Sequence, residues 1–153
     1  MGYFHMFTFL KSSQMKKELF DSNPILKLCF DFSLMVIEYT EKLETLKRFP
    51  LANQLFRSGT AIGANAMEAQ NSESKADFIH KMKIAAKEAE ETQHWLLLCS
   101  HAPNYPDCTI LLQKIEEINK VLGSILRSSK KGYSFHLLLG AFTLFVVNVC
   151  FGS

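Results

Sequence analysis

Apolar residues recur at steps of three and four along four successive segments of the chain. That spacing places an apolar stripe on one face of a helix, so the pattern predicts four amphipathic helices. The expected helices cover residues 24–48, 51–69, 75–100 and 107–127. No alternating run of apolar and polar residues, typical of strands, interrupts them. The sequence therefore predicts an all-α fold, an antiparallel up-down four-helix bundle with extra N- and C-terminal segments.

The apolar stripes also identify the residues expected to face the core. Residues three or four positions apart are neighbours on a helix surface, so each stripe forms one buried face. In chain order the expected core residues are Ile25, Cys29, Phe32, Met35, Val36, Tyr39, Leu43, Leu46, Leu55, Ile62, Ala66, Ala69, Phe78, Met82, Ala85, Ala89, Leu96, Leu111, Ile115, Ile118, Leu122 and Ile125.

Sequence signals at the helix ends agree with this division. Asn23 followed by a proline is typical of a helix start, with the asparagine as the N-cap. Pro50 disfavours helix at the preceding residue and so separates the first two helices. Ser74 and Asp77 have the spacing of a capping box, which predicts the start of the third helix. Two prolines in residues 101–106 predict the break before the fourth.

Small residues line the second predicted helix, with Gly59 and Gly63 in a GxxxG spacing. In an apolar membrane segment this spacing would suggest a dimer contact. Polar residues surround it here, so we expect close packing of helices within a bundle. A leucine at Gly63 is then expected to overpack that contact.

The predicted bundle has a segment on either side, which divides the chain into an N-terminal extension (1–22), the bundle (23–131) and a hydrophobic C-terminal tail (132–153). Residues 1–14 are aromatic-rich without a helical period and are interpreted as an extension or an over-long gene prediction. Residues 134–151 carry no formal charge and would span about 27 Å as a helix, the lower limit for crossing a membrane. We favour a tail packed on the bundle or on an oligomer interface. A membrane anchor and an extension of the gene prediction stay open.

Composition and charge are those of an ordinary globular protein. Apolar residues make up 48% of the chain and charged residues 21%. A net charge of +2 is weaker than is usual for a dedicated nucleic-acid binder. The four cysteines show no paired spacing, so we expect reduced thiols in the cytoplasm rather than disulfides. They are Cys29, Cys99, Cys108 and Cys150.

The sequence shows none of the residue patterns of common enzymes. It contains no glycine-rich phosphate loop, nucleophile elbow or HExxH spacing. Glu91 and His94 form its one Glu-x-x-His, whereas a di-iron site in a bundle needs two copies of that pattern. We therefore expect a protein that is not an enzyme and holds no metal or cofactor.

A group of polar residues is the more informative candidate site. Arg57, Asn65 and Glu68 share one face of the second predicted helix, and Glu88 shares a face with apolar residues of the third. Charged groups near a core are tolerated when they are paired. The group is interpreted as a polar band that fixes helix register or forms a subunit contact. The alternative is a binding site for RNA or a protein.

Three runs of residues resemble the ribosomal-RNA intervening-sequence protein family: 57–65, 77–81 and 87–92, followed by Trp95-Leu96. The similarity extends from about residue 24 to residue 127. It implies a bacterial four-helix bundle that forms a homo-oligomer, often a pentamer. Founding members of the family are encoded within insertions in 23S rRNA genes. Relatives include an accessory protein of diversity-generating retroelements, which binds nucleic acid and a reverse transcriptase.

The resemblance favours a non-enzymatic oligomer associated with RNA or a ribonucleoprotein. A net charge of +2 per chain would become about +10 if five chains assemble, which attracts phosphate. The alternative is an oligomeric protein-interaction scaffold without nucleic acid, because residues 70–73 supply no positive charge. The candidate phosphate contacts are Lys81, Lys83, Lys87, Lys114, Lys120 and Arg127.

Overall fold

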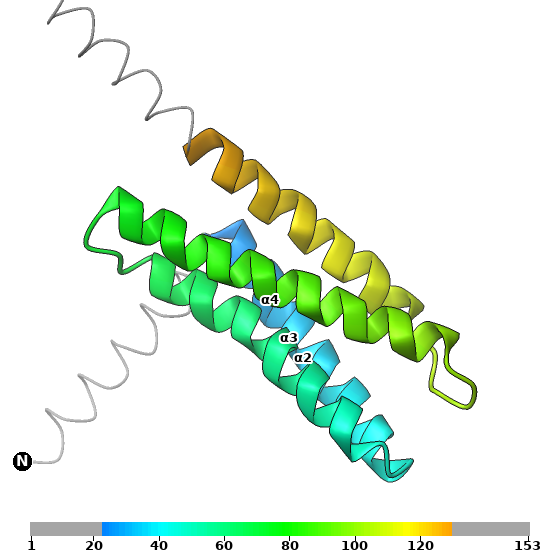
Figure 1. The fold of residues 1–153 in the computed structure, drawn as a ribbon. Helices are drawn as coiled ribbons and strands as arrows, with labels where there is room; N and C mark the ends of the chain where they lie inside the picture. The colour runs from blue at the N-terminus through cyan, green and yellow to red at the C-terminus, as the bar shows by residue number, and fades with distance from the viewer. Residues whose placement is uncertain (1–22, 130–153) are drawn as a thin grey trace, which may run out of the picture.

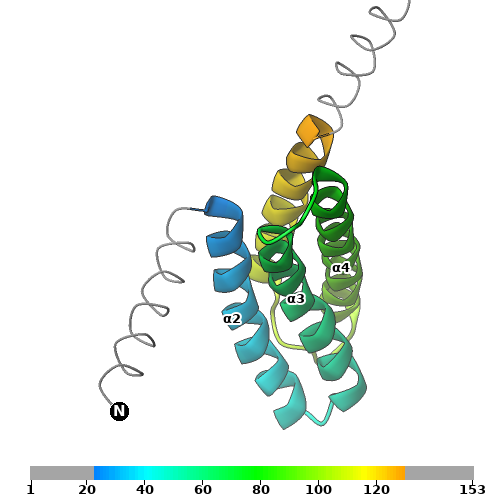
Figure 2. The same ribbon diagram turned by 90° about the vertical axis from the view of Figure 1, so that its left-hand side faces the viewer.

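The computed structural model describes residues 23–129, which form four helices. They are α2 (Pro24–Thr45), α3 (Phe49–Ala69), α4 (Lys75–His101) and a last helix over residues 109–129. Successive helices run in opposite directions and are joined by short connections (Figure 1). Figure 2 shows α3 between α2 and α4, with the helix of residues 109–129 behind them. The described residues contain no strand, and the predicted all-α four-helix bundle is confirmed.

The turn between α2 and α3 differs from the expectation. The first helix ends at Thr45 rather than near Arg48, and the second begins at Phe49 rather than Leu51. Lys47 has a φ of 58°, in the left-handed region, and the Arg48 amide donates to the Leu43 carbonyl at 2.9 Å. These contacts close the turn early. Proline lies in the first turn of α3, where its missing N–H costs nothing.

The side chains at the other helix starts take different roles. The Asp77 amide donates to Ser74 Oγ at 3.1 Å, so the predicted cap of α4 is confirmed. Asn23 precedes α2 as predicted, but its side chain does not cap that helix. Its Nδ2 instead donates to Gln70 Oε1 at 3.0 Å, which joins the start of α2 to the end of α3. The last helix begins at residue 109 rather than 107. The amide and the hydroxyl of Thr109 both donate to the Asp107 carboxylate, which lies outside the helix.

The core contains most of the residues that the apolar stripes predict. Met35, Phe78 and Ile125 are only partly buried and pack against its edge. The prediction that Leu46 faces the core is wrong, because this residue lies beyond the end of α2 and is 49% exposed. Small side chains fill the centre, where Ala66 and Ala89 are fully buried.

The two glycines of the GxxxG spacing are not equivalent. A Cβ at Gly59 would lie 2.9 Å from both methyl carbons of Val36, so α2 and α3 approach closely at this point. A Cβ at Gly63 would lie 3.5 Å from the Cβ of Cys29, which is an ordinary contact. Gly63 also lines an open groove. We therefore expect a larger side chain to overpack the helix contact at Gly59 rather than at Gly63.

The predicted extension (1–22) and tail (132–153), with Cys150 and the candidate membrane segment, lie outside the described residues 23–129. Within the described helices, none is long and apolar enough to cross a membrane.

Candidate functional site

Polar side chains meet along the outer junction of α3 and α4, and this group is here called the α3–α4 polar band. It comprises Gln54, Arg57, Ser58 and Glu68 of α3 with Lys81, Glu91, Thr92 and Trp95 of α4. Ser58 and Thr92 are fully buried at core positions of the two helices, and the other members lie beside the core stripes.

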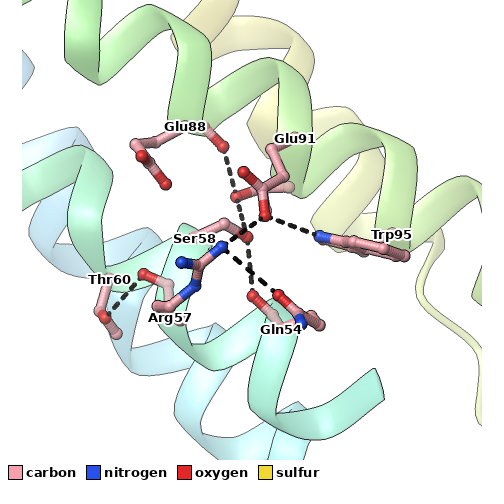
Figure 3. Close-up of polar contacts among 8 residues, drawn as sticks. Gln54, Arg57, Ser58, Thr60, Glu88, Glu91 and Trp95 are labelled. Carbon is pink, nitrogen blue, oxygen red and sulfur yellow. Dashed lines mark hydrogen bonds and ion pairs between the residues drawn. The ribbon is translucent and has the colours of Figure 1, made fainter. Parts of the chain in front are cut away.

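Glu91 is the hub of the band. Its Oε1 accepts hydrogen bonds from Arg57 Nη2 at 3.1 Å and from Trp95 Nε1 at 3.2 Å (Figure 3). Arg57 Nη2 also lies 3.4 Å from Gln54 Oε1. The Arg57 side chain is 67% exposed, so the ion pair adds at most about 1 kcal/mol to stability. The carboxylate mainly fixes the positions of the guanidinium and the indole relative to each other.

A buried hydroxyl pair lies beneath this hub. Thr92 Oγ1 lies 2.9 Å from Ser58 Oγ and 2.7 Å from the Glu88 carbonyl. Ser58 Oγ donates to the Gln54 carbonyl at 3.0 Å, so its oxygen can accept from Thr92. No buried side-chain oxygen or nitrogen in residues 23–129 lacks a partner. The pair favours this register of α3 against α4, because a shift of either helix would break the buried hydroxyl contact that joins them.

The four predicted polar residues do not form one cluster. Arg57 joins Glu91, while Glu68 binds Lys81 in an ion pair of 2.6 Å farther along the band. That hydrogen bond and the charge of Glu68 raise the pKa of Lys81. Asn65 Nδ2 donates to the carbonyl of Ala61 in its own helix at 2.8 Å. The half-buried Glu88 contributes its backbone carbonyl to the band.

The six predicted phosphate contacts fall into two classes. Lys81 pairs with Glu68, and Lys114 and Lys120 pair with Glu117 and Glu116 of their own helix at 2.9 and 2.7 Å. Lys83, Lys87 and Arg127, here called the basic trio, are exposed and make no ion pair with any described residue.

Helix register brings the basic trio to one level of the bundle. Gln93 Oε1 accepts from Asn119 Nδ2 at 2.8 Å, which aligns α4 with the antiparallel helix of residues 109–129. Arg127 lies eight residues after Asn119, and the point midway between Lys83 and Lys87 lies eight residues before Gln93. With equal rise of about 1.5 Å per residue along both helices, Arg127 comes level with the midpoint of Lys83 and Lys87, about 3 Å along the axis from each.

The remaining reactive groups are structural. Cys29, Cys99 and Cys108 are free, buried thiols, and burial raises the pKa of Cys29 to about 12. Burial also raises the pKa of Tyr39, whose hydroxyl donates to the Pro106 carbonyl at 2.9 Å. Thiols held in the protonated form are poor nucleophiles.

The Glu-x-x-His of α4 is engaged in contacts within the protein. Glu91 is the hub described above, and the His94 ring packs edge-on against Trp95 with centroids 5.2 Å apart. Among residues 23–129, no group of three or more acidic, histidine or cysteine side chains is placed to hold a metal ion.

Reasoning from the sequence missed the hydroxyl pair and the hub. Ser58 lies between Leu55 and Ile62 of the core stripe, and Thr92 lies in step with Ala89 and Leu96. Two hydroxyl residues at core positions of adjacent helices were the available signal for their pairing. No comparable signal indicated that Glu91 would turn towards α3.

Comparison with known proteins identifies the family of this chain. Residues 21–124 match the sequence model of the 23S rRNA-intervening sequence protein. A crystal structure from Bacteroides thetaiotaomicron, described as a protein with unknown function from the S23 ribosomal protein family, shares 36% identity with the chain. The match has a TM-score of 0.62 and covers 67% of this chain and 97% of that one. Comparison with curated proteins found no significant match. This chain therefore belongs to the 23S rRNA-intervening sequence protein family.

Proposed function

We propose that this protein is a non-enzymatic, homo-oligomeric helical bundle that associates with RNA or a ribonucleoprotein. The observation that carries the proposal is the basic trio: three exposed cations within about one helical turn of height, without ion pairs among the described residues. The name of the matched family, which refers to 23S rRNA, supports RNA as the partner.

The chemistry of the trio indicates how RNA would be held. Lysine and arginine side chains on exposed helix faces contact phosphates, which fix position but carry no sequence information. Binding is therefore expected to be weak per chain, tolerant of sequence and steeply dependent on salt.

Assembly would strengthen this weak attraction. Each chain has a net charge of +2, and the charges of several copies add in an oligomer. An oligomer would also present several basic trios to one RNA strand, so each additional contact becomes intramolecular.

The test compares unpaired with paired cations. In one variant Lys83, Lys87 and Arg127 are replaced by glutamine; in the matched control Lys81, Lys114 and Lys120 are replaced. Both lose three positive charges, but only the first loses the trio. Binding to a single-stranded RNA is measured between low and moderate salt. If each chain loses three phosphate contacts, the slope of log affinity against log salt should become shallower by about 2.

Two results would contradict the proposal. One is that wild-type protein fails to bind RNA at low salt, which favours the alternative, a protein-interaction scaffold. The other is that the control variant weakens binding as much as the trio variant, since the effect would then reflect net charge alone. Circular dichroism and light scattering establish that each variant keeps its fold and assembly.

A further inference from the structure

The helix α3 carries a second, uncharged and mostly apolar stripe besides the one that faces the core. Its positions advance by steps of four and three and carry no charge: Phe49, Asn53, Phe56, Thr60, Gly63 and Met67. Phe49 is 57% exposed and Phe56 46% exposed. A surface helix with one buried face normally presents charged or polar residues on its others. The second stripe therefore indicates a second face of α3 that becomes buried.

The neighbouring helix α2 extends this apolar surface. Leu34, 47% exposed, lies one turn from Phe30 on α2, which packs beside α3 (Figure 2). A groove of about 280 Å³ runs between the two helices. Its lining is formed by Leu26, Phe30, Ser33, Thr60, Gly63, Ala64 and Met67. The groove and the exposed Leu34, Phe49 and Phe56 are here called the α2–α3 seam.

The seam combines small side chains in its groove with large exposed side chains beside it. Gly63 and Ala64 have little or no side chain and so leave the groove open on its α3 side. Phe56 and Leu34 are large and about half exposed on the surface beside it. Helices pack by placing the side chains of one surface into the hollows of another. One chain thus supplies both the projecting side chains and a hollow that can receive them.

The size of the seam fits an interface between proteins. A phenylalanine presents roughly 150–250 Å², so Phe49 and Phe56 together leave about 200 Å² of apolar surface open. Leu34 and the groove walls enlarge that area. A standard interface buries about 800 Å² per partner, with its apolar centre surrounded by a polar rim. The seam supplies apolar surface of the kind that forms such a centre.

We propose that the α2–α3 seam is covered by a second copy of this chain. No ionisable side chain lines the groove, so a charged partner would have to desolvate its charges without compensation. A second copy avoids this cost, because its own seam offers uncharged, projecting side chains. This inference rests on the homo-oligomer of the proposed function and names the surface through which the copies meet.

The test uses matched lysine substitutions at exposed apolar positions. Phe56→Lys places a charge in the seam, and Leu98→Lys places one on α4, where the native side chain is 44% exposed. We expect Phe56→Lys to raise the concentration for half-assembly at least tenfold in sedimentation analysis. Leu98→Lys should leave it unchanged. Ala64→Glu, also at an exposed position, serves as a second seam variant if Phe56→Lys reduces folding.

Thiol labelling maps the covered surface independently. In a Cys150→Ser background, a cysteine replaces either Thr60 in the seam or Ser124 on the exposed face of the last helix. Labelling of the Thr60→Cys protein should slow as its concentration rises through assembly, whereas labelling of the Ser124→Cys protein should not. A labelling rate at Thr60→Cys that stays constant through the assembly range would overturn the proposal.

Other results would also overturn the inference, and they are distinct from failure of RNA binding. Assembly that survives both seam variants places the interface elsewhere, whether or not RNA binds. If Thr60→Cys is protected in a monomer and loses protection when residues 1–14 are deleted, the chain's own N-terminal segment covers the seam. Conversely, an oligomer that dissociates in the seam variants but never binds RNA leaves this inference intact and removes the proposed partner.

Discussion

At the scale of residues, the contacts that matter most are made by small or hydroxylated side chains. Gly59 lets Val36 approach α3, and the Ser58–Thr92 pair replaces an apolar contact in the core with a directional one. Both hydroxyls have hydrogen-bond partners. The pair therefore favours one arrangement of the two helices without the cost of burying a polar group that lacks a partner. These residues decide how α3 sits between its two neighbours.

We predict that replacing Gly59 and Gly63 by alanine changes the free energy of unfolding in opposite directions. Gly59→Ala forces a methyl group against the stiff, fully buried Val36, so we expect a loss of about 1–2 kcal/mol in unfolding free energy. Gly63→Ala meets only an ordinary contact and should gain about 0.5–1 kcal/mol from reduced backbone entropy of the unfolded chain. Urea denaturation at low protein concentration measures both. Equal effects at the two positions would show that the close approach at Gly59 is absent in solution.

At the scale of elements, three local devices set the helix starts. A proline lies in the first turn of α2 and of α3, a serine caps α4, and Asp107 accepts hydrogen bonds from Thr109, the first residue of the last helix. The hydrogen bonds from Thr109 hold the pKa of Asp107 below its ordinary value. These local devices explain why short connections suffice between long antiparallel helices.

The cap of α4 is directly testable. Ser74→Ala removes the acceptor for the Asp77 amide and should cost about 1 kcal/mol of stability. Ser74→Asp restores an acceptor at the same place, so its melting temperature should stay close to that of the wild type. Should the aspartate variant be as unstable as the alanine variant, the serine would act through something other than its cap.

At the scale of the whole molecule, α3 separates two surfaces of different chemistry. The polar band lies on its α4 side, and the uncharged seam lies on its α2 side. The basic trio lies on α4 and the last helix, away from the seam. One face can therefore join copies of the chain while another stays open to RNA.

Assembly itself is the prediction at this scale. Native mass spectrometry should give a complex that is an integral multiple of the 17.4 kDa chain, because exposed apolar side chains and the family resemblance both favour association. Nuclease treatment should remove any bound RNA and leave the subunit number unchanged. A monomer at every concentration would rule out the oligomer and, with it, the assignment of the seam.

Local patterns in the sequence were sufficient for the helices and most of the core. Steps of three and four marked the buried stripes, since the helical repeat is a property of the chain itself, and the Ser74 spacing fixed a helix start. The predicted burial of Leu46 was wrong because the apolar spacing continues in the sequence beyond Thr45, where the helix ends. The left-handed conformation of Lys47 closes that turn, and no apolar period reports a backbone dihedral.

The candidate site depended on contacts between residues far apart in the chain. The sequence by itself determined that Arg57, Glu68, Lys81 and Glu91 lie on helix faces. Only tertiary structure decided that Glu91 receives Arg57 and Trp95, and that Lys81 is neutralised by Glu68 while Lys83 and Lys87 are not. The physical reason is that a helical period fixes the direction of a side chain, whereas its partner depends on the axial register of the neighbouring helix. Between α3 and α4 that register is favoured here by the buried Ser58–Thr92 pair, while close packing at Gly59 positions α3 against α2.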